Sequence, residues 1–183
     1  MKFLARFTVV LGIFLSAAAV AAQQTDRDRG IDLYSEGKFA DAIPVLEKSV
    51  AVDPTDRAAW LYLGASYVHT GEEEKATNAF KKSNVRGNVP QPKYDSSVNV
   101  TYKPRATYTE RARRKMSSGS VRIAVEFLAD GTIGFVFPLK TPVDPELVQQ
   151  SVDAAKGIRF EPAMKNGKPV TVVNFVEYGF RIG

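Results

Sequence analysis

Side chains that commonly perform catalysis are scarce in this chain of 183 residues. His69 is the only histidine and cysteine is absent. The chain also has no Gly-x-Ser-x-Gly, no phosphate-binding loop and no cluster of residues spaced as metal ligands. Neighbouring carboxylates such as Asp53 and Asp56 suit a turn and a helix start, and a lone histidine without a second nitrogen or sulfur ligand suits a groove edge or a solvated surface. We therefore expect no enzyme, no cofactor and no metal, and a function based on binding.

Charged side chains are distributed unevenly along the chain. Residues 23–80 carry a net charge of −5, whereas residues 81–183 carry +8. Two oppositely charged blocks predict two modules with separate surfaces. The densest cations form a basic patch, which either grips an acidic partner or is a solvated face: Arg111, Arg113, Arg114 and Lys115.

The first 22 residues have the pattern of a secretion signal. Lys2 and Arg6 precede an uncharged, mostly apolar run from Phe7 to Ala22, which closes in small residues. We expect a cleaved signal peptide over residues 1–22. The alternative is a retained membrane anchor, although sixteen helical residues span only about 24 Å of a hydrocarbon core that is about 30 Å thick. Export argues against nucleic acid as a partner and favours anionic lipid, cell-wall polymer or an acidic protein face.

Residues 23–87 contain a repeat with a period of 34 residues. Matching pairs occur at this spacing: Gly37 with Gly71, Ala42 with Ala76, and Leu46 with Phe80. Each unit predicts two short helices that turn at the glycine and cross closely at the alanine. The two units resemble the tetratricopeptide repeat.

That resemblance implies a groove lined by the first helix of each unit. The groove residues would be Ile31, Tyr34, Leu61, Ala65, Val68 and His69. Two units are few for a stacked repeat, so we expect their open end to pack on the second domain, on another copy or on a partner.

The remaining residues predict a linker and a small mixed domain. Residues 88–107 contain three prolines and predict an extended linker with short strand-like pieces. In residues 108–183, the alternating run 121–127 predicts a half-buried strand, Asp130-Gly131 a hairpin turn and residues 133–139 the return strand. A helix starting at Pro145 and a terminal strand over about 169–182 complete a ββαβ antiparallel-sheet domain, so the predicted class is α+β.

Residues 100–183 are similar to the TonB C-terminal domain family. Residues that match the family pattern in order are Tyr108, Ala112, Arg113, Gly119, Val121, Asp130, Gly131, Phe160, Pro162, Ala163, Gly167, Pro169, Val170 and Phe180; Thr109 stands where the family usually has proline. The resemblance implies a periplasmic domain that docks on a short segment of an outer-membrane transporter.

The resemblance also implies how that docking occurs, because the family offers its last strand as a sheet edge. The edge residues would be Val170, Thr171, Val172, Val173, Asn174, Phe175, Val176 and Glu177. Alternatively, the edge is blunted, or it pairs with a second copy of the same chain.

The long proline-rich rod of an energy-transducing TonB is replaced here by repeats. We therefore expect an exported, non-enzymatic periplasmic adaptor that binds envelope proteins through the repeat groove and the terminal strand. The alternative is a TonB-like energy transducer that contacts outer-membrane transporters, with its leader kept as an inner-membrane anchor. A third hypothesis is self-assembly through the terminal strands.

Overall fold

The structure is a computed structural model that describes residues 26–84, 89 and 91–182. The predicted signal peptide lies outside these residues. Within the described part, none of the helices combines the length and the apolar character that crossing a membrane requires.

Two helical hairpins form the N-terminal part of the fold. Their helices are an initial one over residues 26–35, α2 (Phe39–Val52), α3 (Arg57–His69) and α4 (Glu73–Ser83). Gly37 and Gly71 both have a φ of 77°, which glycine adopts without steric cost, so the predicted turns are confirmed. Ala42 and Ala76 are fully buried, as the predicted close helix crossing requires.

A three-stranded antiparallel sheet lies at the centre of the C-terminal part. Its elements are β1 (Asn99–Tyr102), α5 (Glu110–Arg114), β2 (Gly119–Phe127), β3 (Ile133–Pro138), α6 (Pro145–Lys156), β4 (Arg159–Glu161), β5 (Ala163–Lys165), β6 (Lys168–Val170) and β7 (Val172–Phe180). The sheet has the order β3-β2-β7, and β1–β4 and β5–β6 form separate two-stranded ladders. The α+β class and the ββαβ order are confirmed.

The terminal strand differs in detail from its prediction. The structure divides the predicted continuous run at Thr171, which separates β6 from β7. β6 turns back on β5 through Asn166 and Gly167, both of which have positive φ. β7 alone pairs with β2, and it does so through nine consecutive residue pairs.

Both faces of the central sheet are buried at the end where β2 finishes and β7 begins. α6 covers one face, where Val121, Ile123 and Val125 of β2 are fully buried. On the other face, Ala124 and Val173 join the hydrophobic core of the helical hairpins. The prediction of a half-buried strand over residues 121–127 was therefore wrong, because the chain's own repeats cover the side that was expected to face solvent.

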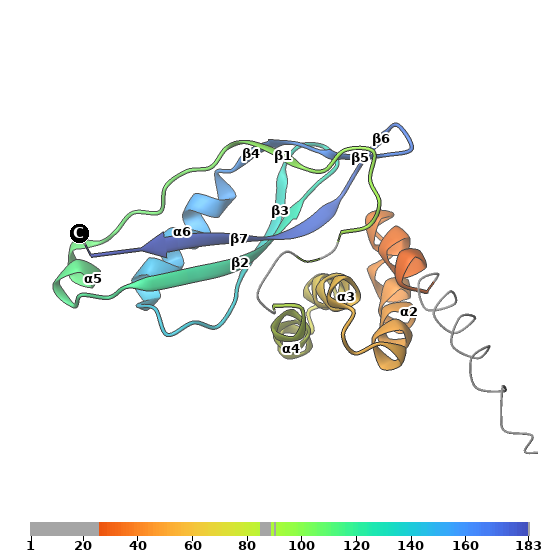
Figure 1. The fold of residues 1–183 in the computed structure, drawn as a ribbon, viewed down its shortest axis with the longest axis horizontal. Coiled ribbons are helices and arrows are strands. Elements are labelled where there is room, and N and C mark those ends of the chain that lie inside the picture. Colours follow the sequence, from red (N-terminus) through yellow and green to blue (C-terminus); the bar gives the residue numbers. More distant parts are fainter. Residues whose placement is uncertain (1–25, 85–88, 90, 183) are drawn as a thin grey trace, which may run out of the picture.

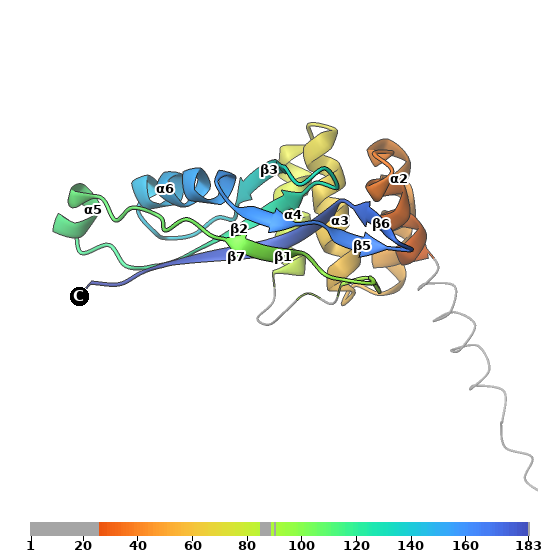
Figure 2. The same cartoon turned by 90° about the horizontal axis from the view of Figure 1, so that it is seen from above.

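The hairpins cover one end of this sheet. They pack where β2 ends and β7 begins, whereas α5 and the C-terminal end lie at the opposite tip of the long β2–β7 ribbon (Figure 1). The view from above shows the same separation, with α6 between the two ends (Figure 2). The molecule is thus elongated, with a two-layered middle and a helical head.

Candidate functional site

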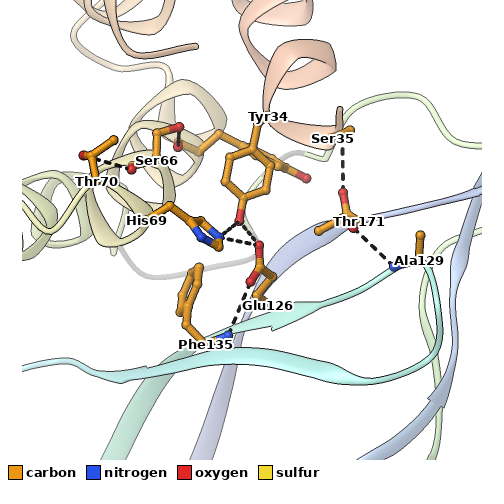
Figure 3. A network of polar contacts seen from close by, with 10 residues as sticks. Tyr34, Ser35, Ser66, His69, Thr70, Glu126, Ala129, Phe135 and Thr171 are labelled. Atoms are coloured by element: carbon orange, nitrogen blue, oxygen red, sulfur yellow. Dashed lines mark hydrogen bonds and ion pairs between the residues drawn. The ribbon is translucent and has the colours of Figure 1, made fainter. Parts of the chain in front are cut away.

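A buried carboxylate joins the two modules. Glu126 on β2 is 1% exposed and points towards the hairpins. The Tyr34 hydroxyl donates a hydrogen bond to its Oε1, and His69 Nε2 donates to the same oxygen at 2.8 Å (Figure 3). The Phe135 backbone N–H donates to Oε2 at 3.3 Å. Burial, together with the adjacent Glu126, raises the pKa of Tyr34 well above its usual value, so this hydroxyl remains a donor.

His69 lies at the edge of this seam between the modules. Its ring stacks on Phe39 with a centroid distance of 3.6 Å, and it meets Phe135 edge-on at 5.7 Å. Its side chain is 26% exposed. In the part of the chain that the structure describes, no cluster of three or more metal-ligating side chains occurs. The geometry therefore gives His69 a packing and hydrogen-bonding role at the seam.

An aromatic cluster completes the seam. Phe80 of α4 is fully buried and contacts three aromatic rings of the sheet. Its centroid distances are 6.3 Å to Phe135, 5.2 Å to Phe137 and 6.4 Å to Phe175. Such pairs stabilise a core beyond the area that they bury. Hairpins and sheet therefore share one hydrophobic core.

The predicted groove residues lie in this shared core. Four of them are at most 1% exposed: Ile31, Tyr34, Leu61 and Ala65. Val68 is partly buried and packs against the same cluster. The structure thus places these side chains in the core that the hairpins share with the sheet, and not on an open surface. Packing of the repeats on the second domain, one of three expected contacts, is present.

β7 is an edge strand of the sheet. Its inner side pairs with β2, and none of the strands in the described residues pairs with its outer side. In an antiparallel ladder, alternate residues direct both backbone groups away from the partner strand. The Glu177 carbonyl accepts a hydrogen bond from Lys103 Nζ at 2.7 Å, which marks it as an outward position. By alternation, Val173, Phe175 and Gly179 are outward as well.

Side chains of the protein itself meet several of these outward groups. Ser35 Oγ donates to the Thr171 carbonyl at 3.3 Å, and the Tyr62 hydroxyl interacts with the backbone of Val173. The Tyr62 and Tyr94 hydroxyls lie 2.8 Å apart, and burial raises the pKa of Tyr62 to about 12. Among the described residues, the backbone of Phe175 and Gly179 meets no such side chain. The edge is therefore tethered at its start and occupied by Lys103 at Glu177, while the outward backbone groups of Phe175 and Gly179 are accessible.

Two hollows flank the open part of this edge. The first has a volume of about 370 Å³ and lies between Asn174–Val176 and residues that include Val98 and Val100. The second, of about 390 Å³, lies between Glu177–Gly179 and residues 103–106. Of the predicted edge residues, Asn174, Phe175, Val176 and Glu177 therefore line accessible space. Val172 and Val173 are buried, and Val170 belongs to the β6 hairpin.

The predicted basic patch is largely paired within the chain. Arg111 lies 3.0 Å from Glu146, and Lys115 lies 2.9 Å from Asp144, whose pKa it lowers. Arg113 lies 3.7 Å from Glu110 on the same short helix. These pairs fix α5 to the start of α6, which leaves Arg114 as the member without an ion pair among the described residues.

Several residues of the site gave no signal in the sequence. Glu126 stands at an alternate position of β2, where an exposed charge is ordinary, and only its burial reveals its partners. Lys103 lies in the predicted linker, and Ser35 and Tyr62 lie in repeat helices whose contact with β7 is non-local. The one indication in the sequence was that a charged residue stands at position 126, between neighbours that the alternating pattern predicts to be buried.

The chain is similar to known proteins in two separate segments. Residues 33–84 match the family model described as "Tetratricopeptide repeat", and residues 104–182 match the one described as "Gram-negative bacterial TonB protein C-terminal". The peroxisomal targeting signal 1 receptor of Dictyostelium discoideum is 36% identical over 56 residues, or 31% of this chain. The chain spans 9% of that receptor's length.

Solved structures are similar to this chain as well. The solution NMR structure of the Pseudomonas aeruginosa TonB CTD is 23% identical, with a TM-score of 0.41, over 48% of this chain and 89% of the other. Both matching families are non-catalytic interaction modules, and the second suggests a protein of the Gram-negative envelope. Residues 33–84 are thus similar to a tetratricopeptide-type repeat, and residues 104–182, which follow it, to a TonB C-terminal domain.

Proposed function

We propose that this protein is an exported, non-enzymatic adaptor of the Gram-negative periplasm that binds another protein by strand addition to the outer edge of β7. The observation that carries the proposal is the regular nine-pair ladder of β7, whose outer side no described strand covers. An extended guest segment gains affinity from backbone hydrogen bonds at such an edge and specificity from alternate side chains.

The opposite edge of the sheet suits a guest less well. β3 has an irregular register against β2 between the pairs at Val125 and Phe127, and it ends at Pro138. Irregular register and proline are features that protect an edge strand from pairing with another chain. β7 has neither feature over its nine residues.

The helical hairpins act as a brace in this proposal. Their groove residues hold the inner face of the sheet, and Ser35 and Tyr62 bind the first outward groups of the edge. A guest strand is therefore directed to the part of the edge from Phe175 to Gly179. Binding of a partner by the groove residues themselves requires the seam at Glu126 to open.

A pair of variants at Gly179 tests strand addition. Gly179→Pro removes an outward N–H, while Gly179→Ala keeps it, and a Cβ at this position meets no atom within 4 Å. Both purified variants are used as bait against a Gram-negative envelope fraction, after circular dichroism has shown that each is folded. The wild type and Gly179→Ala should recover the same protein, and Gly179→Pro should not. Equal recovery by both variants would refute strand addition at this edge.

The match of residues 104–182 with the TonB C-terminal family favours one second candidate, energy coupling at the outer membrane. This role requires the leader to remain as an inner-membrane anchor. Sequencing the N-terminus of the protein isolated from cells decides between the two candidates. A mature chain that starts near Ala22 or Gln23 excludes the anchored form.

A further inference from the structure

We propose that the guest of the β7 edge is an extended segment in which acidic and apolar side chains alternate, and that Lys103 occupies the edge until this guest displaces it. The inference rests on strand addition at β7 and names the chemistry of the partner. It follows from the two hollows beside the edge, from the charges around them and from the contact that separates them.

The two hollows are consecutive along one side of β7. The first follows the edge over Asn174–Val176 and the second over Glu177–Gly179. Residues 98–106 form the opposite wall of both, yet β1 within that wall pairs with β4 and not with β7. Six strand residues span about 20 Å at about 3.3 Å each, so the guest segment is about six residues long.

One side of this channel is apolar. The first hollow is lined by Val89, Val98, Val100, Val176 and Phe127, together with the polar side chain of Gln91. Val100 is 44% exposed, which is high for a large apolar side chain on a strand. Alternate guest side chains that point to this side can bury apolar surface against these valines. β-branched residues fit best, because they favour extended backbone.

The surroundings of the channel are cationic. Lys103, Arg105 and Arg122 line the two hollows, and Glu177 is the only acid among their described lining residues. No ion pair among the described residues involves any of these three cations. Glu177 balances only part of this charge, and a guest that carries carboxylates on its second set of alternate positions is complementary to the remaining excess of cations.

Arg122 has the least solvated of these charges. Its guanidinium lies 4.5 Å from the centroid of the Phe175 ring. Desolvation lowers its pKa, Glu177 opposes this effect, and the nearby cation Arg57 adds to it. Glu177 lies opposite Arg122 in the β2–β7 ladder, and a guest carboxylate would add a second negative charge beside this guanidinium. This position is therefore where the charge of the guest should matter most.

Lys103 imitates a guest strand at one point. Its ammonium donates to the outward Glu177 carbonyl and lies 4.5 Å over the Tyr178 ring, at the boundary between the two hollows. A strand that pairs with β7 needs this carbonyl for one of its own N–H groups. The guest N–H replaces the ammonium there, and the released Lys103 can pair with a guest carboxylate.

Four fluorescein-labelled hexapeptides test the inference by fluorescence anisotropy with the full protein. They are (Glu-Val)₃, (Gln-Val)₃, (Lys-Val)₃ and a (Glu-Val)₃ that is N-methylated at alternate residues. We expect (Glu-Val)₃ to bind about tenfold more tightly than (Gln-Val)₃, since three cations each contribute modestly. This advantage should disappear at about 1 M salt, and (Lys-Val)₃ should bind most weakly.

The Lys103→Met variant tests the displaced side chain. It should bind (Gln-Val)₃ several-fold more tightly than the wild type, because no ammonium has to leave, and its preference for glutamate should shrink. Lys140→Met, at the hollow beside β3, is the matched control and should change neither affinity. Unchanged binding of (Gln-Val)₃ to Lys103→Met would overturn the role of Lys103.

The outcomes separate this inference from strand addition itself. Equal affinity for (Glu-Val)₃ and (Gln-Val)₃, with binding lost on N-methylation, overturns the acidic guest and leaves strand addition standing. Binding that is indifferent to N-methylation overturns strand addition. If no peptide binds while envelope recovery still depends on Gly179, the inference alone fails. Sedimentation that shows two copies joined through this edge overturns it as well.

Discussion

Replacing Tyr34 by phenylalanine removes a single hydroxyl from the seam between hairpins and sheet. Tyr34 and Glu126 are each 1% exposed, so neither group can exchange its lost partner for water. The carboxylate keeps His69 and the Phe135 N–H, and the phenylalanine ring fills the same space. A hydrogen bond to a charged group contributes about 1.5–3 kcal/mol. We expect Tyr34→Phe to lower the free energy of unfolding by that amount.

Urea denaturation followed by circular dichroism at neutral pH measures this loss. In a chain of this length, it corresponds to a decrease in Tm of about 3–12 °C. Tyr67→Phe is the matched control, because the Tyr67 hydroxyl also donates to a glutamate, Glu47, at 2.5 Å. Glu47 is exposed and water replaces the lost donor, so the control should cost less than about 1 kcal/mol.

A double-mutant cycle isolates the contact. Combining Tyr34→Phe with Glu126→Gln should give a total loss smaller than the sum of the two single losses, with a coupling of about 1 kcal/mol or more. If Tyr34→Phe costs no more than Tyr67→Phe, or if the two seam changes are additive, the buried carboxylate does not couple the modules and the reasoning is refuted.

Two further predictions concern alkaline pH and a close backbone approach. Burial raises the pKa of Tyr62 from 10.0 to about 12, so the unfolded chain loses this proton first. The resulting stability is fully present below pH 10 and is lost towards pH 12, at about 1.4 kcal/mol per pH unit. Urea titrations at pH 9.5–11.5 measure how the free energy of unfolding falls with pH, and this fall should be less steep for Tyr62→Phe by that amount. An equally steep fall in the variant contradicts the prediction. Gly134→Ala should destabilise by about 1–3 kcal/mol, because its Cβ would lie 2.1 Å from Oε2 of the buried Glu126, whereas Gly179→Ala should be nearly neutral in thermal melts. Equal melting temperatures for these two variants would show that β3 moves away from Glu126 at little cost.

Local signals in the sequence predicted most of the elements. The 34-residue spacing identified both hairpins, and Gly37 and Gly71 occupy turns because few other residues adopt a φ of 77°. Asp144 caps α6 by accepting a hydrogen bond from the Glu146 N–H at 3.0 Å, as the Asp-Pro pair predicts. These features depend on residues that are close in the sequence.

The missed features depend on contacts between distant residues. An alternating strand has the same pattern whether its second face meets water or a helix of small and aromatic side chains, so Ala124 and Val173 gave no indication of burial. Glu126 looked like an ordinary exposed residue for the same reason. The pairing of β1 with β4 joins residues about 60 positions apart, which spacing arguments do not reach.

The sequence predicted where the candidate site lies, but it did not predict the side-chain contacts that restrict access to it. Matching of the terminal run to a known pattern indicated the β7 edge, but the tethers from Ser35, Tyr62 and Lys103 come from three other segments. The sequence left open whether the repeats pack on the sheet, on another copy of the chain or on a partner. The partner of the groove residues could not be chosen without knowing that the sheet offers Phe135, Phe137 and Phe175 to them.

The shared core has a consequence for how such proteins can be recombined. A foreign pair of repeats joined to residues 88–183 would have to provide both the Tyr34 hydroxyl and the His69 nitrogen in register with Glu126. Without them, the buried Glu126 carboxyl group would lack two of its hydrogen-bond donors, and the aromatic side chains of the seam would be exposed and would promote aggregation. The helical hairpins and the C-terminal sheet domain are therefore structurally matched, and a hybrid protein must take both from the same parent protein.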